Sequence, residues 1–324
     1  MRRTFILLLA VVLLGGLAYL ALSGSDQEMV ADDRAFGYAE ADAIQRIYLA
    51  DRAGNQTDLQ RGGPTGWTVN GYPANENAMK NLLQAVTRLE IRSLPAPAAV
   101  PNLVRTLAGG GILVRLFGKS GEKLRGYYIG GGTNDELGTA AIVEDSEQPY
   151  IVHLPMWSGN VRHRFNLRGD EWRSKRLFAA DPERVELLSI AYPRQESKGF
   201  ALRREADGRY SVTPLIASAG PVKHITAGEA ERVLARYERY FISRYQNEDE
   251  AGMTADRNRL PFASIRLRET GSEEQVVDIY PRFRFPDSAD NRLSAYTAFI
   301  NQGKDYALLA VETTQPLLIG YDAF

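Results

Sequence analysis

The chain has 324 residues, no cysteine, and 39 Lys and Arg against 40 Asp and Glu, which gives a net charge of −1. This balance provides no general attraction to nucleic acid, so we expect no nucleic-acid partner. The lack of cysteine excludes disulfide bonds, thiolate metal sites and cysteine nucleophiles. The length is sufficient for two domains with separate hydrophobic cores.

The N-terminus carries the longest apolar stretch of the sequence. Residues 5–22 hold no charge and follow Arg2 and Arg3. As a helix they would be about 27 Å long, close to the roughly 30 Å hydrocarbon core of a bilayer. The two arginines favour a cytoplasmic N-terminus. We therefore predict a single-pass anchor at residues 1–25, with residues 5–22 in the bacterial inner membrane and the bulk of the chain periplasmic or otherwise extracytoplasmic.

A cleaved signal peptide is the alternative to this anchor. Ala21-Leu22-Ser23 offers small residues at a spacing suited to cleavage. The apolar run is longer than the roughly 7–15 residues of a signal peptide, so we favour the uncleaved anchor. Residues 26–35 are small, polar and acidic, and we expect them to form a short tether.

The first repeat domain is expected over residues 36–155. Apolar residues recur at helical spacing from Met79 to Leu89, which predicts an amphipathic helix over residues 75–89. Prolines after this helix forbid its continuation. Elsewhere in the domain, apolar and polar residues alternate in short runs, as in half-buried strands. The strands are expected at residues 47–49, 57–60, 67–69, 112–116, 124–129, 140–143 and 150–154.

A second repeat domain is expected over residues 182–324, because the same kinds of element recur there in the same order. Its helix is predicted over residues 227–241, where Thr226 and Glu229 form a capping box. The offset between matched segments rises only in loops, which indicates an internal duplication. The matched segments are Ile47-Tyr48-Leu49 with Ser189-Ile190-Ala191, Leu59-Gln60-Arg61 with Leu202-Arg203-Arg204, Trp67-Thr68-Val69 with Tyr210-Ser211-Val212, Ile112, Val114 and Leu116 with Ala263, Ile265 and Leu267, and Tyr150 with Tyr306.

Together these patterns predict an α+β fold. After the N-terminal transmembrane helix we expect two similar tandem domains, each a mainly antiparallel β-sheet with one packed amphipathic helix. The helix is expected to cover one face of its sheet, since its apolar stripe must be buried.

Residues 156–181 form the densest basic stretch of the chain, and we expect them to be a linker between the repeats. In one interpretation this linker contacts anionic lipid headgroups or an acidic partner surface. In the other, its arginines pair with nearby acids and its tryptophans cover the two cores. Residues 281–293, with Arg282, Arg284 and Arg292, are a weaker second candidate for a contact surface. The candidate partner or lipid contacts are Trp157, Arg162, Arg164, Arg168, Trp172, Arg173, Lys175 and Arg176.

No group of residues has the spacing of a known catalytic or cofactor site. The three histidines are far apart and lack ligand partners at helical spacing, so we predict no metal site. The triplet Gly118-Lys119-Ser120 falls in a predicted hairpin turn, and Leu113 stands where a phosphate-binding loop needs its first glycine. We therefore predict no catalytic residues, no cofactor and a non-enzymatic protein.

The anchor is combined with a set of loose hydrophobic motifs. These are Ile44-x-x-Ile47-x-Leu49, Leu59-x-Arg61, Trp67-x-Val69, a helix ending in Leu89, and the stretch Trp172–Phe178 that leads into Asp181 and Val185. In these motifs the chain resembles, over nearly its whole length, the membrane-anchored bacterial repeat family labelled domain of unknown function 4340. Members of that family are often encoded beside ABC-type transport systems of the gliding-motility or auxiliary type. The resemblance implies an accessory subunit with ABC transporter permease or auxiliary subunits as partners, and it supplies no catalytic residues.

Three functions follow as hypotheses. The first is a membrane-anchored extracytoplasmic accessory or scaffold protein, associated with an ABC-type transport system. The second is a periplasmic ligand-binding module for an envelope glycan or lipid, with a groove between the domains. The third is a hydrolase whose carboxylates come together only in the folded chain. We favour the first, keep the second as its alternative, and rank the hydrolase last because it needs convergent titratable groups that the sequence does not disclose.

Overall fold

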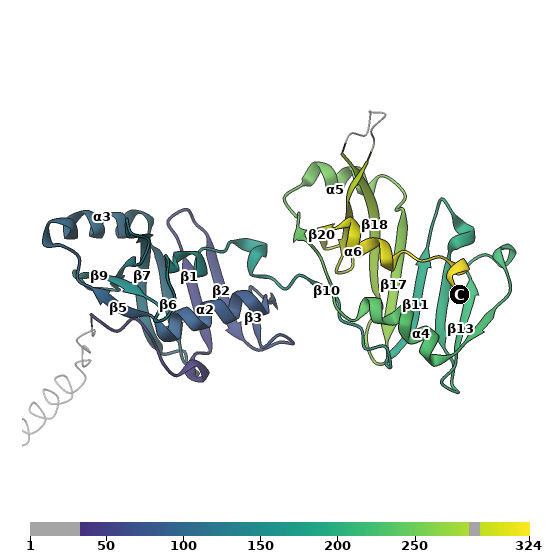
Figure 1. Ribbon diagram of the computed structural model, residues 1–324, viewed down its shortest axis with the longest axis horizontal. Helices are drawn as coiled ribbons and strands as arrows, with labels where there is room; N and C mark the ends of the chain where they lie inside the picture. The colour runs from purple at the N-terminus through teal and green to yellow at the C-terminus, as the bar shows by residue number, and fades with distance from the viewer. Residues whose placement is uncertain (1–32, 285–291) are drawn as a thin grey trace, which may run out of the picture. The chain divides into compact units, whose positions relative to one another are not determined.

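The structure is a computed structural model that describes residues 33–284 and 292–324 (Figure 1). The chain divides between Arg173 and Ser174 into two compact units, called unit 1 and unit 2 below. The predicted anchor and most of the predicted tether lie outside the described residues. Within the described ranges, no helix is both long and apolar enough to cross a bilayer.

Unit 1 is built on one nine-stranded antiparallel sheet with the order β4-β3-β2-β1-β6-β7-β8-β9-β5. Along β6, Ile112, Val114 and Leu116 are buried and the residues between them are half-buried, because successive side chains point to opposite faces. The strands are β1 (Arg46–Ala50), β2 (Gln56–Arg61), β3 (Trp67–Val69), β4 (Tyr72–Pro73), β5 (Glu90–Ser93), β6 (Ile112–Phe117), β7 (Lys123–Gly132), β8 (Thr139–Val143) and β9 (Pro149–His153).

Helix α2 (Glu76–Arg88) is the helix that the sequence predicts for the first domain. It begins after Asn75, whose side chain accepts hydrogen bonds from the amides of Asn77 and Ala78. This cap satisfies two of the amides that a helix leaves free at its N-terminus. The apolar stripe of α2, with Leu82 and Val86 fully buried, packs on one face of the sheet and forms the main core of unit 1. This face is called the first face below, and the opposite one the second face.

A second helix, α3 (Val100–Gly110), corrects the prediction of one helix per domain. Helix α2 already ends at Arg88 and is followed by β5, before the first of these prolines, and Pro101 lies in the first turn of α3. Proline is tolerated there because the first amides of a helix have no partner within it. Helix α3 packs on the second face of the sheet, where Leu107, Ile142 and Ile151 form a smaller core.

Unit 2 has a nine-stranded antiparallel sheet with the order β14-β13-β12-β11-β17-β18-β19-β20-β16. Its α4 (Ala227–Leu234) packs in the main core, and α5 (Glu250–Arg257) packs through Met253 in a smaller cluster on the opposite face. A short α6 (Val311–Thr314) follows the last strand. The strands are β11 (Val185–Ala191), β12 (Phe200–Arg204), β13 (Tyr210–Pro214), β14 (Lys223–Ile225), β16 (Arg244–Tyr245), β17 (Ala263–Glu269), β18 (Gln275–Phe283), β19 (Leu293–Ile300) and β20 (Asp305–Leu309), and a separate pair joins β10 (Arg176–Phe178) to β15 (Tyr240–Phe241).

The two sheets have the same strand order, element for element, and each unit places its two longer helices between the same strands. Strand register aligns them residue by residue. In unit 1, Leu59 lies opposite Val69 in the next strand, and in unit 2 Leu202 lies opposite Val212. The fold is therefore α+β and mostly antiparallel, as predicted, and one topology occurs twice.

Two of the predicted residue matches are wrong by one position. Ile47 lies opposite Leu116, and Leu188 lies opposite Leu267, so Ile47 corresponds to Leu188 and not to Ser189. The other error concerns Tyr150, which belongs to the main core of unit 1, whereas Tyr306 belongs to the smaller cluster on the second face of unit 2. A shift of one residue moves a strand side chain to the other face, which explains both errors.

The stretch predicted as a linker, residues 156–181, is divided between the units. Phe165 and Trp172 are buried in the main core of unit 1. Leu177 and Phe178 are buried in the main core of unit 2. Each unit therefore extends into the basic segment and uses its apolar side chains for packing.

Candidate functional site

Arg162, one of the predicted contacts, ties two elements of unit 1 together. Its guanidinium donates hydrogen bonds to the carbonyls of Gly110 (2.8 Å), at the end of α3, and Ile129 (2.9 Å), in β7. Burial disfavours the charged form and lowers the pKa of Arg162. A cation at the C-terminus of α3 also complements the helix dipole.

Arg164 is buried against α2. It donates to the Gln84 side chain (2.7 Å) and to the carbonyl of Asn81 (3.2 Å), and its guanidinium lies 4.9 Å from the centre of the Trp157 ring. Burial lowers the pKa of Arg164. The side chain therefore holds the basic segment against the middle of α2, and the Trp157 ring covers its guanidinium.

The remaining members of the segment also contact their own unit. Trp172 is fully buried and donates to the Leu167 carbonyl (2.8 Å). Arg173 pairs with Asp170 (2.9 Å) and lies 3.8 Å from the centre of the Tyr72 ring. In unit 2, Lys175 donates to the Ser243 carbonyl (3.0 Å), and Arg176 lies over the ring of Phe241. The acidic partners that the structural interpretation expected are present for Arg168 and Arg173. Arg162 and Lys175 donate to carbonyl oxygens instead, and both tryptophans pack in unit 1. Whether the same residues also touch a lipid or a partner stays a prediction.

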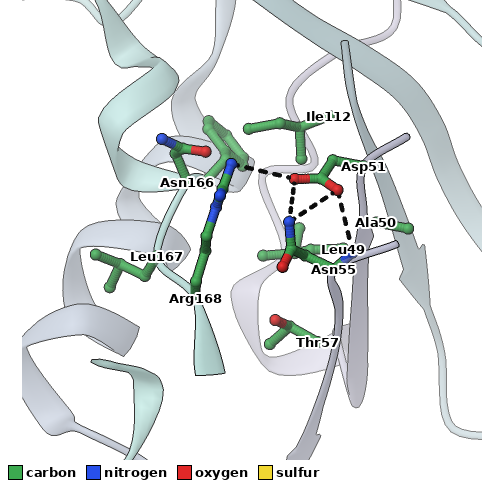
Figure 2. Close-up of a pocket in the computed structure, with 10 residues that line it drawn as sticks. Leu49, Ala50, Asp51, Asn55, Thr57, Ile112, Asn166, Leu167 and Arg168 are labelled. Atoms are coloured by element: carbon green, nitrogen blue, oxygen red, sulfur yellow. Dashed lines mark hydrogen bonds and ion pairs between the residues drawn. The ribbon is translucent and has the colours of Figure 1, made fainter. Parts of the chain in front are cut away.

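Arg168 is the most solvent-accessible arginine of the unit 1 part of the segment and faces a small cleft beside Asp51 (Figure 2). The Asp51 carboxylate accepts hydrogen bonds from the amides of Ala53 and Asn55, and from the Asn55 side chain, which holds the pKa of Asp51 below its usual range. Arg168 adds an ion pair at 3.5 Å. The cleft has a volume of about 20 Å³, which is room for about one water molecule. We assign this cluster a structural role in the turn between β1 and β2.

A larger cavity, called the α3 groove below, lies between α3 and the second face of the unit 1 sheet. Its volume is about 220 Å³. Leu107 and Ile142 are almost fully buried, and Arg52 and Asp145 are exposed. In the part of the chain that the structure describes, neither of these two charged side chains has a hydrogen bond or an ion pair. The groove is lined by Arg52, Val104, Leu107, Ala108, Tyr128, Ile142, Val143, Asp145 and Ser146.

Beside the groove, the second face of the sheet carries a buried carboxylate. Glu144 accepts hydrogen bonds from Arg115 (3.0 Å) and Lys123 (3.2 Å). Burial opposes the charge of Glu144, but these two cations outweigh it and lower the pKa of the carboxyl. Gly126 leaves room for this carboxylate, since a Cβ there would lie 2.3 Å from an oxygen of Glu144. The charge is therefore fully compensated within unit 1.

The second faces of the two units differ in chemistry at three equivalent positions. Tyr48, Leu113 and Tyr128 are half-buried on the second face of unit 1. The equivalent positions of unit 2 are occupied by Ser189, Ser264 and Asp278. Tyr48 lies opposite Arg115, as Ser189 lies opposite Arg266. Leu113 lies opposite Tyr128, as Ser264 lies opposite Asp278. The first copy thus presents an apolar, aromatic surface where the second copy presents polar side chains.

Under α5, unit 2 holds a buried polar cluster. Asp256 has no solvent exposure and accepts hydrogen bonds from Arg259 (2.6 Å), Thr297 (2.6 Å) and Tyr306. Arg282 lies 3.4 Å from the same carboxylate and also donates to the Tyr306 hydroxyl. Burial, together with the Asp256 carboxylate, raises the pKa of Tyr306. The cluster fastens α5 to β18, β19 and β20, and the weaker sequence candidate Arg282 is part of it.

The second face of unit 1 and the second face of unit 2 carry features that the sequence analysis did not predict. Asp256 and Arg259 are spaced i and i+3, but the sequence does not show that three distant side chains meet them. Within the described ranges, no three His, Asp or Glu side chains are grouped to hold a metal ion. No protein-family model, no curated protein and no solved structure matches this chain.

Proposed function

We propose that this chain is a membrane-tethered, extracytoplasmic scaffold protein that presents two related units to partner proteins, with subunits of an ABC-type transport system as those partners. The uncharged residues 5–22, preceded by Arg2 and Arg3, support the tether. The transporter association comes from the family resemblance described above. The units themselves supply the docking surfaces.

The observation that carries this proposal is one topology used twice with different surfaces. The main cores keep the same pattern in both units, because both need it to fold. The second faces have diverged, from Tyr48 and Tyr128 in unit 1 to Ser189 and Asp278 in unit 2. A half-buried aromatic face beside an apolar groove is the kind of surface that protein interfaces use.

The direct test is affinity purification of the tagged full-length chain from native membranes in a mild detergent, at native expression. We expect permease or ATPase subunits to be recovered in amounts comparable to the chain itself. An untagged strain and a tagged, unrelated single-pass protein control for background. Recovery of the chain alone would contradict the proposal.

A ligand-binding module is the second candidate, and the α3 groove favours it. Its apolar floor suits an acyl chain, but its volume of about 220 Å³ is below the roughly 300–1,000 Å³ of sites that enclose a whole ligand. Thermal-shift measurements with envelope glycans and phospholipids separate the two candidates. A saturable rise in the melting temperature with one of these compounds would favour the ligand-binding module.

A further inference from the structure

The size of the α3 groove limits what it can hold. An apolar cavity of about 150 Å³ accommodates one benzene ring. With about 220 Å³, the groove has room for one large apolar side chain and little more. Leu107 and Ile142 form the floor of the groove, and Val104, Ala108 and Tyr128 also line it.

The charges of the groove define what should flank that side chain. Arg52 and Asp145 line the same groove, carry opposite charges and have no ionic partner in the described part of the chain. A ligand with a single charge would satisfy one of them and face a like charge at the other. A segment with an acidic residue on one side of an apolar residue and a basic residue on the other side matches both.

The equivalent face of unit 2 carries an aromatic side chain at the position of Ile142. In unit 1, Tyr128 lies opposite Ile142 in the neighbouring strand. In unit 2, Asp278 lies opposite Phe299 in the equivalent strands, so Phe299 corresponds to Ile142. The Phe299 ring packs with Tyr280 and Tyr306, and the Arg257 guanidinium lies 5.0 Å from its centre. An aromatic side chain of the protein itself thus occupies this side of the sheet in unit 2.

We infer that the α3 groove is a docking site for a polypeptide segment of the partner, which inserts one large apolar side chain flanked by one acidic and one basic residue. This inference rests on the proposed function and names the surface that performs it. Apolar anchors that enter a pocket with a charged rim supply most of the affinity at many interfaces. The acidic residue would pair with Arg52 and the basic residue with Asp145.

The site is tested with capped tripeptides on the full-length chain in lipid nanodiscs. The probes are acetylated, amidated Glu-Phe-Lys and Lys-Phe-Glu, and binding is followed by methyl NMR of Ile142. We expect at least one probe to shift the Ile142 signal, while Ile279 in the core of unit 2 stays unchanged. Replacing phenylalanine by alanine in the probe should weaken binding about 10- to 100-fold, because the buried ring supplies most of the affinity.

Charge reversal tests the rim. Arg52→Glu should weaken the better probe about two- to tenfold, as expected for exposed charge pairs. Arg194→Glu is the matched control, since Arg194 is also exposed and follows the equivalent strand of unit 2, and it should have no effect. The inference is overturned by an unmoved Ile142 signal, by equal binding of the phenylalanine and alanine probes, or by tighter binding of decanoate, which would assign the groove to acyl chains.

Co-purification separates this inference from the proposed function. If the wild-type chain recovers transporter subunits and Arg52→Glu recovers them equally well, the groove is not the docking site, but the scaffold function stands. If the wild-type chain recovers no partner, the scaffold function fails, and the tripeptide titration still decides whether the groove binds a polypeptide.

Discussion

The buried carboxylate of Asp256 offers the sharpest test of the packing in unit 2. Asp256→Ala removes the acceptor for Arg259, Thr297 and Tyr306, and it leaves Arg282 without its nearest buried anion. Removing one partner of a buried ion pair costs about 3–5 kcal/mol. The Arg259 and Arg282 side chains remain 39% and 32% exposed, so water restores part of their lost stabilisation. We therefore expect a loss near the lower end, about 3 kcal/mol.

Urea unfolding measures this loss for each unit separately. All three tryptophans lie in unit 1, so their fluorescence reports on unit 1, whereas far-UV circular dichroism reports on both units. With a urea dependence of about 2 kcal/mol per M, the unit 2 transition should move down by about 1.5 M. The fluorescence transition should not move. Glu238→Ala removes the same charge from an exposed position of unit 2 and should change stability by less than about 0.5 kcal/mol. An Asp256→Ala shift as small as that of Glu238→Ala would refute this account of the cluster.

Three further predictions concern unit 1 and are read by tryptophan fluorescence in urea. Gly126→Ala should destabilise unit 1 by about 1–3 kcal/mol, because its methyl group would overlap the Glu144 carboxylate, whereas Gly131→Ala in the same strand meets no atom and should be nearly neutral. The pKa of Glu144 is lower in the folded state than the ordinary carboxyl value of 4.5, so its charge stabilises unit 1 fully at pH values above 4.5. This contribution should disappear as the pH falls through the lowered pKa, and Glu144→Gln should remove this pH dependence of the stability. Arg164→Ala should cost about 2–3 kcal/mol, since Arg164 is buried, and Arg168→Ala less than about 1 kcal/mol; equal losses would contradict the structural role assigned to Arg164.

The periodic elements of the fold could be predicted from the sequence. Strand β6 is predicted from its alternation of residues, and α2 from its apolar stripe, because each pattern follows from burial of one face of the element. Helix α3 could not be predicted in the same way. Pro101 by itself suggests a helix breaker, and only the packing of Leu107 on the second face shows that this proline lies in the first turn of a helix.

The candidate site was harder to predict, because it depends on which face each strand residue occupies. The sequence alignment of the two repeats was wrong by one residue in this strand, so it did not match Ile47 with Leu188. For the same reason it did not show that Tyr48 corresponds to Ser189. The basic segment was recognisable by its composition. Its contacts, such as that of Arg164 with Gln84 from another helix, depend on tertiary packing that no local pattern records.

We propose that the two units serve as docking surfaces for a membrane complex. Quantitative mass spectrometry of the complex purified with the full-length chain, in a mild detergent and at native expression, is the decisive experiment. We expect a defined ratio of transporter subunits to the chain, and a lower ratio for Arg52→Glu than for Arg194→Glu. A chain that purifies by itself, with its N-terminal residues intact, would contradict it.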